Sequence, residues 1–244
     1  VRGTVQGVGF RPFVARLAAE HGLAGSVANT DAGVEIRLEG QTAALERAVE
    51  RVRTDPPRLA TITDIEVADA RVEGFEKFEI VPSADDGDRT TLVPPDTAVC
   101  PDCREELLSP TSRFSDYWAT SCVNCGPRFS VVESLPYDRA TTALSEFEPC
   151  QDCREEYEAP TDRRFHAQTI ACPSCGPTLS ALAPDGTTRE EGPVALDHAA
   201  GRLDDGDILA SKAAAAVTSP GGRPTRRRTS RRRRRRPRIT ARPR

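Results

Sequence analysis

The sequence has no methionine, only two lysines and few aromatic residues, which make up 5% of its 244 positions. It contains no run of about 20 apolar residues, the length that a membrane-spanning helix needs, so we expect no transmembrane segment. No basic region followed by an apolar stretch opens the chain, which disfavours secretion, and we expect a cytoplasmic protein. Because a strand-like pattern begins at once, without an initiating methionine, we expect the true start to lie upstream.

Basic and acidic residues are unevenly distributed along the chain. Residues 1–210 contain 20 basic and 37 acidic residues, whereas residues 211–244 contain 14 basic residues and no acidic one. An acidic, lysine-poor body is typical of proteins from high salt or of GC-rich coding sequences, and both interpretations stay open. The segment 211–244 has almost no aliphatic residues, so we expect it to be disordered. It is either a polybasic arm that binds nucleic acid or an anionic surface, or, as we favour, the translation of a shifted reading frame.

The eight cysteines form four C-x-x-C pairs that reveal an internal repeat. Residues 100–130 align without gaps on residues 150–180, with 14 of 31 positions identical, which indicates two copies of one supersecondary unit. In each copy 18 residues separate the two pairs, so that two tight turns supply four thiolates to one tetrahedral zinc ion. The predicted ligands are Cys100, Cys103, Cys122 and Cys125 in the first copy, and Cys150, Cys153, Cys172 and Cys175 in the second.

Both predicted zinc ions are expected to be structural, because four sulfur ligands leave no open coordination position. Pairing within each copy is favoured over pairing across copies, since closing a shorter loop costs less entropy. A disulfide framework and a thioredoxin-like redox site are alternatives, disfavoured because there is no secretory leader and no surrounding βαβ pattern. His166 is a further potential ligand, although a polar loop residue is the simpler interpretation.

Residues 1–82 are predicted to form a separate α+β domain. Strands are expected at 1–5, 25–29, 33–39, 61–67 and 75–81. Helices are expected from Pro12 to Gly22 and over 42–54, the second burying Leu45, Val49 and Val52. This β-α-β-β-α-β order, with an extra or split last strand, predicts a ferredoxin-like sandwich. The sandwich is followed by a linker at 83–99 and by two small zinc-stapled modules at 100–130 and 150–180.

The loop before the first helix is the candidate catalytic region. Gly7 and Gly9 let successive backbone N–H groups converge at a helix N-terminus, and Arg11 adds a fork of donors suited to phosphoryl oxygens. Asn29, at the end of the second strand, has the donor and acceptor needed to orient a water molecule. Taken alone this is a weak signal, because many glycine-rich turns bind nothing.

The sequence around these residues resembles the acylphosphatase family, through G-x-V-Q-G-V-G-F-R at 3–11 and G-x-V-x-N-T at 25–30. Such a domain followed by paired zinc modules resembles the N-terminal part of the HypF family of carbamoyltransferases, over about residues 1–210. R-R-F-H-A-Q at 163–168 is also similar to that family, whereas Arg113-Phe114 departs from its paired arginine, which concerns loop geometry rather than ligands. Residues 181–210 are interpreted as a linker and the incomplete start of the family's YrdC-like domain.

The resemblance implies an acyl phosphate site. Asn29 would position the attacking water, and the phosphate would be bound by Arg11 and by the N–H groups of Gly7, Val8, Gly9, Phe10 and Arg11. No general base is evident, so we expect the substrate phosphate to accept the proton and catalysis to rest on orientation and electrostatics.

The resemblance also implies the substrate and the partners. The family's acyl phosphate is carbamoyl phosphate, and later domains, which the chain lacks, use the carbamate with ATP. They transfer the carbamoyl group to the partner HypE, on the way to the cyanide ligand of nickel–iron hydrogenase. We therefore expect hydrolysis of acyl phosphates here without complete carbamoyl transfer.

The alternative function is a non-enzymatic interaction module, in which the zinc units and the polybasic segment recruit a protein or a nucleic acid. The acidic body makes nucleic acid the weaker choice of partner, because its charge repels phosphate, although less so in high salt.

Overall fold

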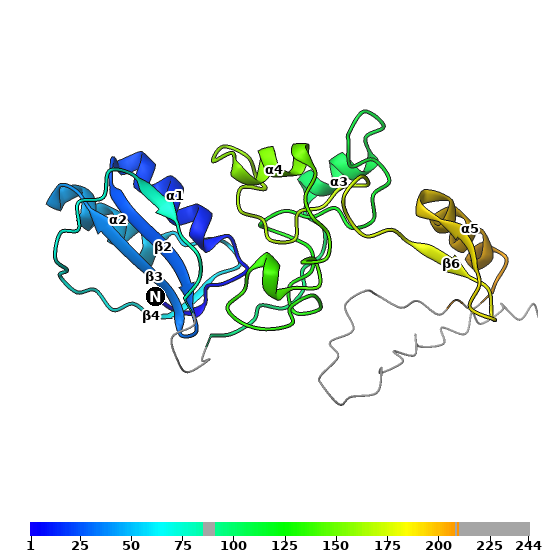
Figure 1. Ribbon diagram of the computed structural model, residues 1–244, viewed down its shortest axis with the longest axis horizontal. Helices are drawn as coiled ribbons and strands as arrows, with labels where there is room; N and C mark the ends of the chain where they lie inside the picture. Colours follow the sequence, from blue (N-terminus) through cyan, green and yellow to red (C-terminus); the bar gives the residue numbers. More distant parts are fainter. Residues whose placement is uncertain (85–90, 208, 210–244) are drawn as a thin grey trace, which may run out of the picture.

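The computed structural model describes residues 1–84, 91–207 and 209, which form three successive parts along the chain (Figure 1). An α/β domain comes first, a cysteine-rich region with long loops follows, and a hairpin with one helix comes last. Among these residues no helix has the length and apolar character needed to cross a membrane. The polybasic segment 211–244 lies outside the described residues, as do residues 208 and 210 of the expected start of a further domain.

The N-terminal domain has the predicted α+β ferredoxin-like architecture. Its elements are β1 (Arg2–Thr4), α1 (Phe10–His21), β2 (Ala24–Thr30), β3 (Gly33–Glu39), α2 (Thr42–Thr54), β4 (Thr61–Asp64) and β5 (Phe78–Ile80). β1 pairs antiparallel with β4, and β2 pairs antiparallel with β3 and parallel with β5. Reciprocal backbone hydrogen bonds of 2.8 and 2.9 Å between Val1 and Val34 join β1 to β3. The resulting strand order is β4-β1-β3-β2-β5, with β5 as the extra edge strand.

Helix α1 begins at Phe10, two residues earlier than expected from Pro12. Gly9 adopts a left-handed conformation (φ 77°) as the N-cap, and its carbonyl accepts the N–H of Phe13 at 3.1 Å. The helix ends as predicted at Gly22, which is also left-handed. Starting the helix at Phe10 places Arg11 in its first turn, beside the glycine loop.

Helix α2 has the predicted bounds, and Val52 is buried as predicted, but the other two predicted core positions were one residue off. Ala44, Ala48 and Val52 are the buried residues, whereas Leu45 and Val49 are only partly buried. α2 packs against α1, and the two alanines on its buried face occupy core positions that were expected to hold larger side chains. α1, α2, β2 and β3 all contribute side chains to one apolar core.

The two cysteine repeats are built alike and share a second core. Each begins with a short helix whose N-cap is the first cysteine of the repeat: Cys100 precedes α3 (Pro101–Leu108) and Cys150 precedes α4 (Gln151–Glu158). A short 3-10 helix, η1 (Arg139–Thr141), lies in the connection between the repeats. The shared core combines apolar residues of both repeats and of the connection between them: Phe114, Tyr117, Val123, Val131, Leu144, Ala167, Ile170 and Ala171. The two predicted modules are therefore present and pack against each other through this core.

The last described part is a β-hairpin of β6 (Ser180–Leu182) and β7 (Thr188–Glu191), followed by α5 (Gly192–Asp204). It covers the residues in which the start of a further domain was expected. In Figure 1 it lies at the opposite end of the molecule from the N-terminal domain, with the cysteine repeats between them.

Candidate functional site

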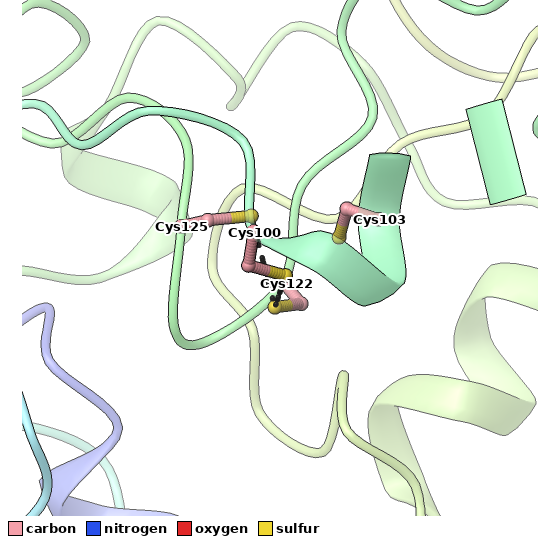
Figure 2. A group of neighbouring side chains, drawn as sticks. All are labelled: Cys100, Cys103, Cys122 and Cys125. Carbon is pink, nitrogen blue, oxygen red and sulfur yellow. Dashed lines mark hydrogen bonds between the residues drawn. The ribbon is translucent and has the colours of Figure 1, made fainter. Parts of the chain in front are cut away.

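The structure gathers the eight cysteines into two groups of four, one within each repeat. In each group all four sulfur atoms lie within 4.8 Å of one another. Figure 2 shows the first group, in which Cys103 projects from α3 and Cys122 and Cys125 come from a loop. The neighbouring Sγ–Sγ distances are 3.8 Å in the first group and 3.6 to 3.7 Å in the second.

These distances fit a tetrahedral zinc ion. Zn–S bonds of about 2.3 Å place the ligands of a tetrahedron about 3.8 Å apart, whereas a disulfide needs about 2.05 Å. All eight cysteines are free thiols, which counts against a disulfide framework. His166 belongs to neither group, so the structure gives it no part in metal binding. Both tetrads can therefore hold a metal ion with a closed shell of four sulfurs.

An arginine of each repeat reaches the cysteine group of the other repeat. Arg113 donates to Cys153 Sγ at 3.4 Å and to Glu156 at 2.8 Å. Arg163, its equivalent 50 residues later, donates to Cys100 Sγ at 3.8 Å and to Glu106. Four thiolates around a divalent cation carry net negative charge, which these guanidinium groups offset. The exchange makes each predicted metal site depend on side chains from both repeats.

The first repeat has Arg113-Phe114 where the second has two arginines, and the structure explains this difference. Phe114 stands where the second repeat has Arg164, and the two side chains meet, with the Arg164 guanidinium carbon 3.8 Å from the centre of the Phe114 ring. Arg164 is only 2% exposed and also pairs with Glu106 and Glu156. A second buried arginine at position 114 would place two like charges in contact, so the phenylalanine allows the repeats to pack together.

Arg11 and Asn29 line one cavity, and part of its wall comes from the cysteine repeats and their connection. The cavity volume is about 30 Å³, room for about two water molecules. Its lining from the N-terminal domain is Val5, Gly7, Gly9, Phe10, Arg11, Pro12 and Asn29. The rest of its lining comes from the cysteine repeats and, for Tyr137, from the connection between them: Val123, Arg128, Tyr137, His166, Ala167, Gln168 and Thr169. The second set was not predicted from the sequence as part of this site.

The glycine loop offers free backbone donors to this cavity. Gly7 (φ 68°) and Gly9 (φ 77°) are both left-handed, which favours glycine. A Cβ at Gly7 would lie 3.3 Å from the Arg128 and Tyr137 side chains, and one at Gly9 would lie 3.2 Å from Val123. In the described part of the chain the N–H groups of Gly7, Val8 and Gly9 donate to no other protein group, whereas the Gly7 carbonyl accepts from Arg128. These donors are available to an anion.

The loop around Tyr137 already contacts both predicted catalytic side chains. Arg11 Nη2 lies 2.6 Å from Asp138 Oδ1 and 3.4 Å from the Tyr137 carbonyl oxygen. Asn29 Nδ2 donates to the same carbonyl at 2.9 Å, and its buried Oδ1 has no partner among the described protein groups. Asp138 is itself held by the hydroxyl of Ser83. The loop therefore fixes the orientation of Arg11 and Asn29, and places a carboxylate where Arg11 would meet an anion.

His166 is a site residue whose role the sequence did not indicate. Its backbone is left-handed (φ 54°), and its ring lies between those of Tyr157 and Phe165, with centroid distances of 4.8 and 4.7 Å. Burial, and then the charge of Arg11, lower the pKa of His166 to about 4, against the opposing effect of Asp138. The imidazole is therefore neutral at pH 7. The only sequence signal was its place in R-R-F-H-A-Q, a segment that says nothing about which cavity it lines.

Comparison with known protein families finds matches for the N-terminal domain and for the two cysteine repeats. The acylphosphatase family profile matches residues 1–80, and the HypF finger profile matches residues 99–132 and 150–182. Carbamoyltransferase HypF2 of Cupriavidus necator is 48% identical over 149 residues, which cover 59% of this chain and 18% of that protein. The acylphosphatase of Archaeoglobus fulgidus is 43% identical over 81 residues, which cover 33% of this chain and 90% of that protein.

Solved structures extend the match to most of the chain. Full-length HypF in its phosphate- and nucleotide-bound form superposes with a TM-score of 0.76 at 39% identity, covering 84% of this chain and 26% of that one. HypF of T. kodakarensis gives a TM-score of 0.73 at 43% identity, with the same coverage. The chain spans about a fifth of the length of the curated carbamoyltransferases that it matches.

Proposed function

Because residues 1–80 belong to the acylphosphatase family and the two cysteine repeats are HypF fingers, as in the N-terminal part of HypF carbamoyltransferases, we propose that this chain hydrolyses acyl phosphates. The substrate is carbamoyl phosphate, and the products are carbamate and phosphate. The carbamate serves ATP-dependent carbamoyl transfer to HypE in hydrogenase maturation. One observation carries the proposal: Arg11, Asn29 and the glycines Gly7 and Gly9, whose N–H groups donate to no other described protein group, line a single small cavity.

In the proposed mechanism the phosphoryl group is bound by the N–H groups of residues 7–11 and by the Arg11 guanidinium. The Asn29 amide, anchored through Nδ2, offers its free Oδ1 to a water molecule and aligns it with the phosphorus atom. Attack by the water breaks the bond between phosphorus and the acyl oxygen, so that carbamate leaves with the electron pair. The water proton passes to a phosphoryl oxygen. The protein thus contributes orientation and electrostatic stabilisation rather than a general base.

The two tetrads would each hold one zinc ion through four cysteines, and such an ion supplies structural cross-linking with no open position for substrate. The interaction-module alternative depends on the basic segment 211–244, which lies outside the described residues.

The proposal is tested by the release of phosphate from carbamoyl and acetyl phosphate by the full chain. We expect Asn29→Ala to lower kcat about 100-fold, because the water loses its orienting acceptor while the phosphate-binding groups remain. Ser26→Ala, on the same strand but outside the cavity, is the matched control and should leave the rate unchanged. Equal rates in all three proteins, or no hydrolysis by the wild type, would contradict the proposal.

A second expectation concerns the carboxylate beside Arg11. Asp138→Asn keeps an oxygen acceptor for Arg11 and Ser83 but removes a negative charge next to the proposed phosphate site. We expect KM for carbamoyl phosphate to fall about fivefold, with kcat changed less than about twofold, since relief of like-charge repulsion is worth about 1 kcal/mol near a protein surface. The measurement is steady-state kinetics at several salt concentrations. An unchanged KM would show that Asp138 does not oppose the phosphate.

A further inference from the structure

The second cysteine repeat places a fixed loop over the proposed acyl phosphate site. Residues 166–169, here termed the roof loop, line the same cavity as Gly7, Gly9, Arg11 and Asn29. Gln168 anchors the roof loop with its whole amide, because Oε1 accepts the Arg139 N–H at 2.8 Å and Nε2 donates to Tyr157 Oη and to the His166 carbonyl. Both donor hydrogens of the Gln168 amide are therefore used within the protein, and Gln168 holds the loop in place.

His166 differs from Gln168 in that its polar atoms stay available. Its ring is held by contacts with the Tyr157 and Phe165 rings, and within the described part of the chain its imidazole nitrogens make no hydrogen bond. With a pKa of about 4 the ring is neutral at physiological pH. A neutral imidazole offers one N–H donor and one nitrogen acceptor.

The cavity is small compared with an acyl phosphate. Its volume of about 30 Å³ corresponds to about two water molecules. In the proposed mechanism the phosphate lies against the glycine loop and the Arg11 guanidinium, which line one side of the cavity. The acyl group then has to lie on the remaining wall, to which the roof loop contributes.

On the basis of the proposed function, we infer that His166 determines the acyl specificity of the site. It selects an acyl group that is small and that carries both a hydrogen-bond donor and an acceptor. A carbamoyl group has this pattern, with its NH₂ donor and C=O acceptor, whereas an acetyl group lacks the donor and a benzoyl group is larger. The HypF finger thus supplies to the acylphosphatase domain a residue that selects the acyl group of the substrate.

The test compares kcat/KM for carbamoyl, acetyl and benzoyl phosphate in the full chain and two variants. His166→Gly removes the side chain and suits the left-handed backbone at this position. His166→Asn also tolerates that backbone but has a shorter side chain. His198→Ala, at an exposed position on α5, is the matched control. Metal content and the unfolding midpoint of each variant show whether the roof loop is still folded.

We expect the wild type and His198→Ala to prefer carbamoyl phosphate. In both His166 variants the preference for carbamoyl over acetyl phosphate should fall about tenfold, with acetyl phosphate hydrolysis nearly unchanged. His166→Gly should also increase the use of benzoyl phosphate relative to carbamoyl phosphate. Unchanged substrate ratios in an active enzyme would overturn the inference alone, as would an equal loss on all three substrates. A wild-type chain inactive on all three would overturn the proposed function and the inference together.

Discussion

Replacement of Arg11 by alanine is expected to lower kcat/KM for carbamoyl phosphate about 1000-fold. The guanidinium is the one cationic group that the N-terminal domain contributes to the described cavity, where solvent screening is weak because the side chain is only 8% exposed. Loss of a donor that stabilises transferring phosphoryl charge in such a site typically costs about 10²- to 10³-fold, and loss of an arginine more. Phosphate release measures the effect, and Arg53→Ala, at an exposed position of α2, is the matched control.

Arg11 also ties the N-terminal domain to Asp138, so the loss of activity must be separated from loss of structure. Arg11→Lys retains a cation for the ion pair but lacks the planar fork that binds two phosphoryl oxygens at once. We expect Arg11→Lys to keep the unfolding midpoint of the wild type while losing about 10- to 100-fold in rate. An Arg11→Ala protein with normal metal content and a rate within about twofold of wild type would refute a catalytic role.

The parts of the site that the sequence predicted are those set by local pattern. Gly22 ends α1 as predicted, because its left-handed backbone favours glycine, and such a residue is visible in the sequence, whereas the helix start after Gly9 was placed too late, at Pro12. The cysteine groups follow from spacing alone, since a C-x-x-C turn can present two sulfurs to one ion. Two of the three core positions of α2 were misplaced because periodicity weighs leucine and valine above alanine, whereas Ala44 and Ala48 are the buried residues.

The contribution of the cysteine repeats and their connection to the cavity could not be predicted in this way. Asp138 meets Arg11, and Tyr137 meets Asn29, across more than 100 residues of chain. Tyr137 and Asp138 lie between the two repeats, outside both aligned segments, where neither periodicity nor motif marks them. His166 reaches the cavity only because the second repeat packs against the first, through the Arg164–Phe114 contact and the shared core. Such tertiary contacts depend on packing that a single sequence does not encode locally.

Removal of metal is expected to unfold both cysteine repeats together while the N-terminal domain stays folded. Binding of a structural zinc ion contributes about 10–16 kcal/mol, as much as the whole stability of a typical domain, which is about 5–15 kcal/mol. The repeats share one core, and each tetrad receives an arginine from the other repeat. We therefore expect that neither repeat folds alone. The N-terminal domain keeps its own core of α1, α2 and sheet residues.

A more specific experiment disrupts only one of the two cysteine tetrads. Cys153→Ser removes a fully buried ligand of the second repeat, and Thr161→Ala, at an exposed position of the same repeat, is the matched control. We expect about two zinc ions per chain in the wild type and the control, and well under one in Cys153→Ser, because the first tetrad loses the support of Arg163. Limited proteolysis should then leave a resistant fragment close to residues 1–82.

The same variant separates the roles of the two parts in catalysis. If the repeats position Arg11 and Asn29 through Tyr137 and Asp138, Cys153→Ser should retain a folded acylphosphatase domain but lose most of its activity on carbamoyl phosphate. Hydrolysis of benzoyl phosphate should suffer less, because the roof loop that excludes large acyl groups is then no longer held in place. Retention of one tightly bound zinc ion and of full carbamoyl phosphate hydrolysis would instead mean that the repeats fold independently and that the catalytic domain does not need them.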